Sequence, residues 1–279
     1  MTKIKAACVQ MRSGVDVAPN IAAASALIRE AAGQGAKFIA TPEMTNLLDI
    51  RPGMARPKIV AEADDASLAA FRPLAAELGV TLLIGSLAVT LPDEDRFANR
   101  SFLIGPDGGV IARYDKIHMF DVEVGDGQNY RESRAYRPGE AAVLAKAPFG
   151  QVGMTICYDL RFPHLYRGLA QAGADVLTIP AAFTRVTGEA HWHVLVRARA
   201  IETGCFVIAP AQGGRHEDGR ETFGHSLIVS PWGEVIVEAE GAEHGIVLAE
   251  LDLGEVAKAR GRIPSLGNDK DIVVTRMGD

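Results

Sequence analysis

The amino-acid sequence predicts an α/β protein in which helices cover the outer faces of two packed sheets. Strand and helix patterns alternate in the first part of the chain, paired strands follow in the middle, and the alternation then resumes. With 279 residues, of which 48% are hydrophobic, the chain can bury a substantial core. We therefore expect a layered sandwich of two similar halves that forms a single domain over 1–279.

The first half of the chain supplies elements with clear boundary residues. Asn20 is suited to capping a helix over 21–32, and Gly79 is suited to ending a helix over 65–78 that Pro73 is expected to kink. The expected strands lie at 4–10, 37–40, 81–84, 86–90, 100–104 and 109–114. The last three are expected to be antiparallel, because they are joined by turns rich in proline, aspartate and glycine.

The second half resumes the alternation after a long polar segment. Residues 117–139 show little periodicity, and a connection of this length is expected to build a site. The tail from about 263 to 279 also lacks periodicity, so we expect it to be extended. The expected strands lie at 151–156, 175–179, 205–209, 226–229, 235–239 and 245–250, and the expected helices at 163–172 and 190–203.

Composition and charge argue against several classes of protein. The net charge is −6 and the basic residues form no run, which argues against a nucleic-acid partner. No apolar run approaches the roughly 18 residues of a membrane span, and the first residues show a strand pattern rather than a leader. We therefore expect a cytoplasmic protein with no membrane partner. Three widely spaced cysteines, Cys8, Cys157 and Cys205, predict reduced thiols rather than disulfides.

The histidines do not predict a metal site. His191 and His193 lie two residues apart on an expected helix, where their side chains point in different directions and would not share an ion. The sequence also lacks the closely spaced cysteine and histidine sets that are typical of zinc sites. We expect no metal and no cofactor, and the expected roles of these two histidines are packing and hydrogen bonding.

Three residues that could carry chemistry follow expected strands. Glu43 comes after 37–40, Lys116 after 109–114, and Cys157 stands between a strand and a helix. A thiol needs a base to become a nucleophile, and an ammonium beside both groups would stabilise a thiolate and then an oxyanion. Taken singly, Cys157 could be a buried structural cysteine, Glu43 could cap a turn, and Lys116 could be a solvated lysine.

The segments that carry these residues resemble the three signature segments of the nitrilase superfamily of carbon–nitrogen hydrolases. They are Thr41-Pro42-Glu43-Met44, Tyr114 through Asp121, and Gly153 through Pro163. The segments Gly188 through Gly204, Gln212 through Ser226 and Pro231-Trp232-Gly233 resemble the branch that holds deaminated glutathione amidase and omega-amidase. The resemblance runs from the first strand to this last turn. After Pro264, however, the chain departs from the basic pair and Asp-Leu-Tyr that relatives of this branch tend to show.

The resemblance implies a four-layer αββα sandwich with two mixed sheets and a Glu-Lys-Cys triad that acts on amides or nitriles without a cofactor. Position by position, it makes Cys157 the nucleophile, Glu43 the general base and acid, and Lys116 a stabiliser of the oxyanion. The backbone N–H of Tyr158 would be the second oxyanion donor. A further glutamate usually accompanies the triad, and Glu132 fits that position better than Glu140, the alternative.

Three further residues are candidates for contacting a substrate. Arg161 could bind a substrate carboxylate or pair with a nearby acid such as Asp159. Phe183 and Thr184 follow a strand at the same edge as the triad, where they could line the pocket or, for Phe183, serve only packing. The resemblance also implies a homodimer or a higher homo-oligomer, since members of the family commonly associate through helices.

Three functional hypotheses follow. The leading one is an amidase for a small amide that carries a carboxylate, such as deaminated glutathione or the omega-amide of a short keto acid. A nitrilase or an N-carbamoyl hydrolase would use the same triad on a different bond. A binding module that keeps the fold without turnover is the third hypothesis, and the presence of all three triad residues argues against it.

Overall fold

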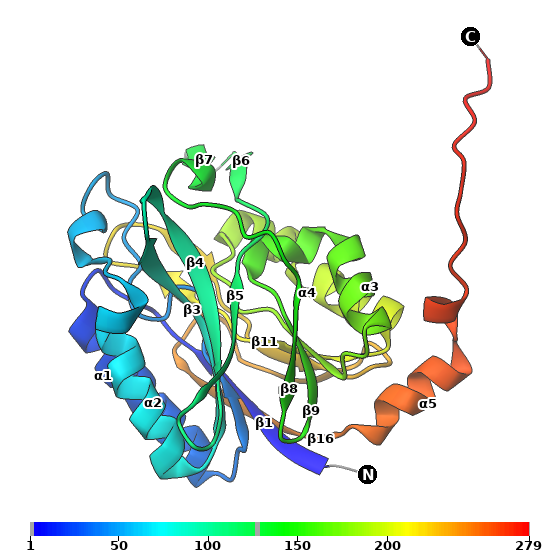
Figure 1. The fold of residues 1–279 in the computed structure, drawn as a ribbon, viewed down its shortest axis with the longest axis horizontal. Coiled ribbons are helices and arrows are strands. Elements are labelled where there is room, and N and C mark those ends of the chain that lie inside the picture. The colour runs from blue at the N-terminus through cyan, green and yellow to red at the C-terminus, as the bar shows by residue number, and fades with distance from the viewer. Residues whose placement is uncertain (1–2, 126–128, 279) are drawn as a thin grey trace.

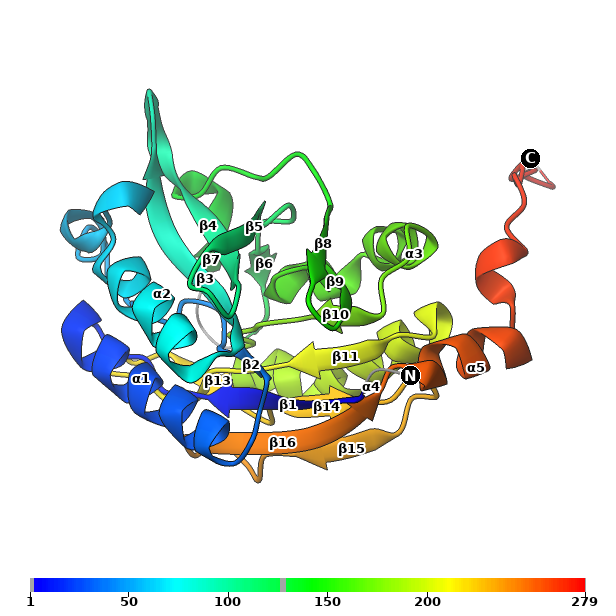
Figure 2. The same cartoon turned by 60° about the horizontal axis from the view of Figure 1, so that its bottom comes forward.

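Two six-stranded sheets pack face to face, with helices on their outer sides, in the computed structural model, which describes residues 3–125 and 129–278. Helices α1 and α2 lie together on one side of the molecule and helices α3 and α4 on the other (Figure 1). The turned view shows the layered order of helices and sheets (Figure 2). Both sheets combine parallel and antiparallel strand pairs. The predicted four-layer sandwich with two mixed sheets is therefore confirmed.

The first sheet holds the N-terminal strands and one C-terminal strand. Its order is β16-β1-β2-β3-β4-β5, with β1, β2 and β3 parallel to one another. The strands are β1 (Lys3–Gln10), β2 (Phe38–Ala40), β3 (Thr81–Leu91), β4 (Glu94–Ile104), β5 (Val110–Asp115) and β16 (Gly245–Asp252). Side chains alternate along β1, so that Ala6 and Cys8 face the core between the sheets while Ala7 and Val9 face the core under α1 and α2.

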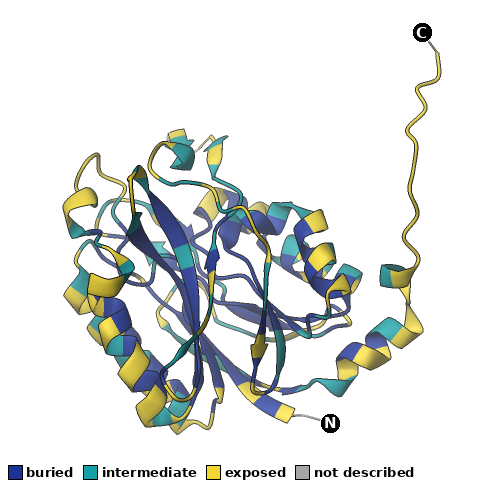
Figure 3. Ribbon diagram, in the orientation of Figure 1, coloured by how far each residue is buried: buried dark blue, intermediate teal, exposed yellow. Residues whose placement is uncertain are grey.

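The second sheet repeats this arrangement in the C-terminal half. Its order is β15-β14-β11-β10-β9-β8, with β9, β10 and β11 parallel. The strands are β8 (Val143–Ala147), β9 (Gly150–Met154), β10 (Val176–Thr178), β11 (Phe206–Ala209), β14 (Leu227–Val229) and β15 (Val235–Glu238). The sheets and the inward faces of the helices are buried, whereas the outward helix faces are exposed (Figure 3). The central strands have nearly continuous apolar sequences because they are buried on both faces.

The helices begin and end at residues suited to those positions. Asp65 accepts hydrogen bonds from the backbone of Ser67 and Leu68 at the start of α2, and Gly79 ends α2 in the left-handed conformation. Thr184 caps α4 by accepting a hydrogen bond from Thr187. The helices are α1 (Val17–Gly33), α2 (Ala66–Leu78), α3 (Pro163–Gln171), α4 (Arg185–Thr203) and α5 (Gly254–Arg262).

Several predicted boundaries were wrong. Helix α1 begins at Val17, and Asn20 does not cap it, because the buried Asn20 side chain instead bonds to the backbone of Gly14 and Asn46. Helix α4 begins five residues before the predicted start because its cap is Thr184. Strands β3 and β4 also run further toward their shared turn than predicted, since the polar residues near the hairpin tip still pair.

Short elements complete the described chain. The polar segment after β5 contains β6 (Asp121–Glu123), β7 (Asn129–Arg131) and a short 3-10 helix, Glu132–Arg134. The glycine-rich segment after β11 forms the hairpin of β12 (Gly213–Arg215) and β13 (Glu221–Phe223). After a 3-10 turn at Ser265–Gly267, residues 268–278 have no regular structure and extend away from the sandwich (Figure 1). Within the described chain, no helix has the length and apolarity needed to cross a bilayer.

Candidate active site

The ends of three strands bring the candidate residues together. Glu43 follows β2, Lys116 directly follows β5, and Cys157 opens a 3-10 turn after β9. Strands β2 and β9 belong to different sheets. The packing of the sheets places the carboxyl ends of these two strands beside each other. Residues that are 73 and 41 positions apart in the chain thus meet at one edge of the sandwich, as open α/β folds favour.

Lys116 lies at the centre of a buried ionic cluster. Its Nζ lies 2.9 Å from Oε1 of Glu43 and 2.9 Å from Oε2 of Glu132. Asn99 donates from its Nδ2 to both carboxylates, over 3.0 Å to Glu43 and 3.2 Å to Glu132. The backbone N–H of Ala182 donates to the other Glu43 oxygen at 3.0 Å. These contacts fix Glu43 on both oxygens, because each oxygen accepts from a different element.

The cluster sets the protonation states of its members. Burial acts to raise the pKa of Glu43, but the Lys116 ammonium and hydrogen bonds from Cys157 and Lys116 outweigh it and hold that pKa below its ordinary value. Burial would lower the pKa of Lys116, yet Glu132 and Glu43 raise it well above its ordinary value. Burial and the Glu43 charge raise the pKa of Cys157. At rest the site therefore holds a thiol, a carboxylate and an ammonium.

The backbone presents Cys157 at a strained position. Its φ angle is +51°, in the left-handed region that residues other than glycine rarely adopt. The backbone N–H of Cys157 donates to Pro180 at 2.9 Å, which ties the turn to the segment after β10. Tyr158 is the second residue of the 3-10 turn, where a backbone N–H has no partner within the turn. Strain of this kind is characteristic of sites where a side chain must point at a ligand.

Asp159 locks this turn onto the segment that carries Lys116. One of its oxygens accepts from the Tyr114 hydroxyl at 2.6 Å and from the Ile156 N–H at 2.9 Å. The other accepts from the His118 N–H at 3.1 Å and contacts His118 Nδ1 at 2.6 Å. Asp159 is fully buried, so these bonds are shielded from water. The cysteine turn and the lysine segment are therefore held in one fixed relation.

A cavity of about 580 Å³ opens above the cluster. Glu43, Lys116 and Cys157 all line it, together with Glu132. The predicted substrate contacts Tyr158, Phe183 and Thr184 line it as well. Its lining is rich in arginine, contributed by Arg51, Arg56, Arg131, Arg134 and Arg220. A volume of this size suits a small organic substrate, and the arginines favour one that carries negative charge.

Arg161 lies behind the cavity wall rather than on it. Its guanidinium lies over the rings of Tyr158 and Phe183, at 6.0 and 5.5 Å from their centroids. Its Nη2 contacts His191 Nδ1 at 3.3 Å, and within the described chain it forms no ion pair with Asp159. Arg161 is also absent from the residues that line the cavity. In this structure it supports two lining aromatic rings.

Sequence reasoning missed three residues of the site. Asn99 and Asp159 hold the cluster, and Arg220 lines the cavity while donating from Nη2 to the Ala182 carbonyl at 2.6 Å. The Nε atom of Arg220 is buried and has no hydrogen-bond partner among the described residues. Asp159 could have been found from its place in the third signature segment. Asn99 and Arg220 lie in a strand and a loop whose neighbours depend on strand pairing, and no local pattern marks them.

Comparison with known proteins identifies the family of this chain. Residues 5–261 match the carbon–nitrogen hydrolase family, and the chain belongs to that family. The chain is 41% identical to deaminated glutathione amidase from Synechocystis over 265 residues, which cover 94% of this chain and 96% of the relative. It is 35% identical to human omega-amidase NIT2, with 95% of this chain and 94% of the relative covered. The predicted resemblance is confirmed.

Solved structures share this fold. The C. elegans NitFhit protein aligns with a TM-score of 0.88 and 32% identity, covering 97% of this chain and 66% of that one. Saccharomyces cerevisiae Nit3, described as a member of branch 10 of the nitrilase superfamily, aligns with a TM-score of 0.84 and 30% identity. That alignment covers 94% of this chain and 95% of Nit3. The protein is therefore an enzyme of the carbon–nitrogen hydrolase family.

Proposed function

We propose that the enzyme is an amidase that needs no cofactor and hydrolyses the C–N bond of a small carboxylate-bearing amide through a cysteine thioester. The observation that carries this proposal is the meeting of Cys157, Glu43 and Lys116 in the lining of one cavity. In this proposal the whole chain acts as one carbon–nitrogen hydrolase domain, which the match over 5–261 supports. The names of its relatives favour an amide over a nitrile or carbamoyl substrate.

Acylation begins with transfer of the Cys157 proton. Because the pKa of the thiol is raised and that of Glu43 is lowered, the proton rests on sulfur and moves to Glu43 as sulfur attacks the amide carbon. The new C–S bond turns the carbonyl oxygen into an oxyanion. Lys116 and the Tyr158 N–H stabilise that charge, and each donor of this kind typically contributes about 3 kcal/mol.

Collapse of the tetrahedral intermediate breaks the C–N bond. Protonated Glu43 gives its proton to the departing nitrogen, which leaves as ammonia or an amine and frees the carboxylate for the second half of the cycle. A water molecule then gives a proton to Glu43 while its oxygen attacks the thioester carbon. The C–S bond breaks, the sulfur recovers the proton from Glu43, and the carboxylic acid leaves.

Glu132 has a supporting role in this scheme. Both its oxygens contact Lys116 Nζ, at 3.0 and 2.9 Å, and its Oε2 also accepts from the Phe120 N–H at 2.6 Å. It therefore balances the lysine charge in a buried place, where an unpaired ammonium would be costly. We propose that Glu132 keeps Lys116 charged and in position, while Glu43 alone moves the proton.

We propose that Arg220 contacts the carboxylate of the substrate. Its buried Nε lacks a partner in the described chain, and burial of an unsatisfied donor is unfavourable unless a ligand completes it. Two other arginines of the cavity lining are already engaged, since Arg51 pairs with Asp49 and Arg131 with Glu123. Arg161 remains a second candidate that would act from behind Tyr158 and Phe183.

The reaction is tested by its products. Purified enzyme is incubated with matched amide, nitrile and N-carbamoyl derivatives of the same short dicarboxylic acids, and ammonia, acid and carbon dioxide are measured. We expect one ammonia and one acid per amide consumed. Acid and ammonia from the nitrile with uptake of two waters would favour a nitrilase, and release of carbon dioxide would favour an N-carbamoyl hydrolase. No product from any class would favour a binding module.

We also propose that the enzyme is a cytoplasmic homodimer or a higher homo-oligomer that associates through α4. Apolar side chains are exposed on its outer face, with Val194 at 69% and Ile201 at 54%, and Trp232 lies exposed near Ile201. Isolated exposed apolar residues are common, but three near one helix suit an interface. Light scattering on the enzyme and on Val194→Asp tests this, and a parent that is monomeric at all concentrations would contradict it.

A further inference from the structure

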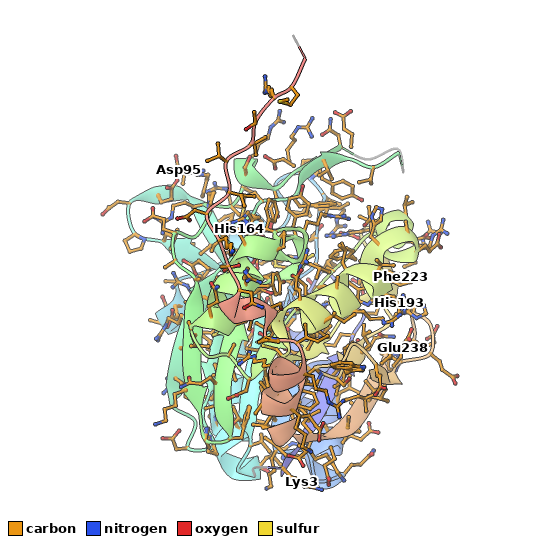
Figure 4. The ribbon with its side chains drawn as sticks, turned by 90° about the vertical axis from the view of Figure 1, so that its right-hand side faces the viewer. Lys3, Asp95, His164, His193, Phe223 and Glu238 are labelled. Carbon is orange, nitrogen blue, oxygen red and sulfur yellow. The ribbon has the colours of Figure 1, made fainter. Side chains whose placement is uncertain are left out.

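A second cluster of ionisable side chains lies outside the catalytic cavity. His193 comes from α4, His225 from the segment between β13 and β14, and Glu238 is the last residue of β15. The nitrogen and oxygen atoms that they offer all lie within 4.8 Å of one another. Figure 4 shows His193 and Glu238 side by side next to α4, with Phe223 adjacent. The three residues are absent from the cavity lining, so the amidase mechanism does not use them.

The geometry of the cluster is convergent. His193 Nε2 lies 2.8 Å from Glu238 Oε1, and His225 Nδ1 lies 2.6 Å from the same oxygen. Two imidazole nitrogens from separate elements thus point at one carboxylate oxygen. Imidazole nitrogen and carboxylate oxygen are the ligands that zinc and related divalent ions combine in proteins. A cation near this oxygen would replace the two hydrogen bonds with three metal–ligand contacts.

Neighbouring residues hold the two imidazoles in place. The Phe223 ring stacks on His225 with centroids 4.2 Å apart and meets His193 edge-on at 5.8 Å. Trp192 Nε1 donates to the His225 carbonyl at 2.9 Å. His225 has a φ of +55°, a conformation that costs free energy in a residue with a side chain. A Cβ at Gly188 would lie 2.2 Å from Phe223 Cβ, so the helix must approach Phe223 closely.

Charge and access also suit a cation. The three side chains are each about one-third exposed, at 35%, 27% and 31%, so an ion can reach them from solvent. Among the described residues, Glu238 forms ion pairs only with these two histidines and with no lysine or arginine. With both imidazoles neutral, the cluster carries a single negative charge. A divalent cation therefore meets one charged ligand and two neutral ones, with room for water.

We propose that His193, His225 and Glu238 form a binding site for a divalent ion of the zinc type, with three protein ligands and an open position for water. The site joins α4 to β15. It also connects to the catalytic cavity, because Trp192, which holds His225, packs at 5.0 Å against the ring of the lining residue Phe183. The ion takes no part in the chemistry at Cys157, and its role is to fix α4.

Zinc titration of a protein that lacks the active-site cysteine tests the proposal. The background is Cys157→Ala, which removes the reactive thiol as a competing ligand. Metal-free protein is titrated with Zn²⁺ by calorimetry and separately with Co²⁺ by visible absorption. The test variants are His193→Gln, His225→Gln and Glu238→Gln. His191→Gln is the matched control, since His191 lies on the same helix, is exposed and is outside the cluster.

We expect one equivalent of zinc to bind the background protein and to raise its melting temperature. Each test variant should bind at least about tenfold more weakly, in line with the loss of a ligand at a three-residue site, and should lose the cobalt absorption bands. The His191→Gln protein should match the background protein in its zinc affinity and in its cobalt absorption bands. Melting in the presence of a chelator checks that every variant is folded.

Two results would overturn the proposal. One is the absence of zinc binding to the Cys157→Ala protein, which would leave the cluster as a hydrogen-bonded contact between α4 and β15. The other is binding that survives in His193→Gln and Glu238→Gln, or that is lost in His191→Gln, because the ion would then lie elsewhere. Neither result bears on amide hydrolysis, which is measured on the enzyme with Cys157 intact.

Discussion

Two clusters in this enzyme combine carboxylates with nitrogen bases, and their surroundings give them different properties. In the cavity, Lys116 lies between Glu43 and Glu132 and is only 2% exposed. Beside the middle of α4, Glu238 lies between His193 and His225, with about a third of each side chain exposed. Both clusters join residues from separate elements, but the first is centred on an ammonium between two carboxylates and the second on a carboxylate between two imidazoles.

The difference lies in the nitrogen base and in the access of water. A lysine between two carboxylates is a permanent cation, and burial makes the removal of any member costly. Two imidazoles can be neutral, so their cluster offers free electron pairs to an incoming ion. The cavity cluster is therefore suited to moving a proton beside the Cys157 thiol, and the outer cluster to binding a cation. The predictions below test this contrast, from the largest expected effect to the smallest.

Replacing Cys157 by alanine should have the largest effect. Because no other group in the cluster can form the thioester, Cys157→Ala should lower kcat by more than about a thousandfold. The fold should persist, since the change removes one sulfur atom from a cavity-lining side chain. Ammonia release and thermal unfolding measure the two properties. Substantial turnover by this variant would end the assignment of Cys157 as nucleophile.

Lys116→Met should affect both activity and stability. It leaves Glu43 and Glu132 buried without their cation, and breaking a buried pair in this way typically costs about 3–5 kcal/mol in the free energy of unfolding. Denaturant unfolding gives the stability, and ammonia release gives the activity. Lys146→Met on the exposed side of β8 is the control and should change stability by less than about 0.5 kcal/mol. Equal stability of the two variants would refute the buried ionic cluster.

Glu132→Gln should reduce activity without abolishing it. The amide can still accept from Lys116 and Phe120, but it holds the ammonium less firmly charged and in position, so stabilisation of the oxyanion should weaken and kcat should fall roughly tenfold or more. Steady-state kinetics measure this effect. Glu140→Gln is the matched control, because Glu140 is exposed and lies in the same connection. A larger loss in Glu140→Gln than in Glu132→Gln would reverse the two assignments.

Arg220→Lys should change substrate preference. Lysine keeps the charge but loses the fork that binds a carboxylate, so kcat/KM for the carboxylate-bearing amide should fall roughly tenfold, while a neutral amide of equal length is affected little. The ratio of the two kcat/KM values is the readout. Arg161→Lys serves as the comparison. Equal losses for both substrates would make Arg220 a positioning residue, and a ratio that changes only in Arg161→Lys would transfer the role to Arg161.

The smallest effect is expected from pH. The pKa of Glu43 lies below its ordinary value of 4.5. The carboxylate therefore stays ionised, and able to act as a base, at pH values above 4.5, and it becomes protonated only as pH falls below that value. The pKa of Lys116 lies well above 10.5, so the ammonium persists through neutral and mildly alkaline pH. We expect kcat/KM to be nearly flat between these limits. A sharp loss between pH 6 and 8 in a kinetic profile would contradict these protonation states.

The sequence predicts the meeting of the cavity residues better than their surroundings. Glu43, Lys116 and Cys157 each follow an expected strand, but it was the resemblance of the segments that carry them to the nitrilase superfamily, and not their spacing, that implied that they meet. Asn99 could not be anticipated, because its role depends on the register of β4 against neighbouring segments. Asp159 was considered only as a partner of Arg161, whereas it holds Tyr114 and His118.

Other predictions were wrong because a local sequence rule did not account for contacts that form only when the chain folds. Asn20 has a side chain suited to a cap, yet burial made its bonds to Gly14 and Asn46 more favourable. The hydrogen bonding expected of His193 is confirmed by its contact with Glu238, a partner 45 residues further along the chain that the helix pattern could not identify. Helix spacing correctly predicts that His191 and His193 diverge, but it cannot show what a helix face meets after folding.

The account depends most on a covalent bond between the acyl group of the substrate and the sulfur of Cys157. Acid quenching during turnover, followed by digestion and mass spectrometry, measures this directly. The account predicts a peptide containing Cys157 that is heavier by the mass of the acyl group, and the loss of this species in Cys157→Ala. Rapid amide hydrolysis with an unmodified Cys157 peptide at every quench time, even when deacylation is slowed, would contradict it.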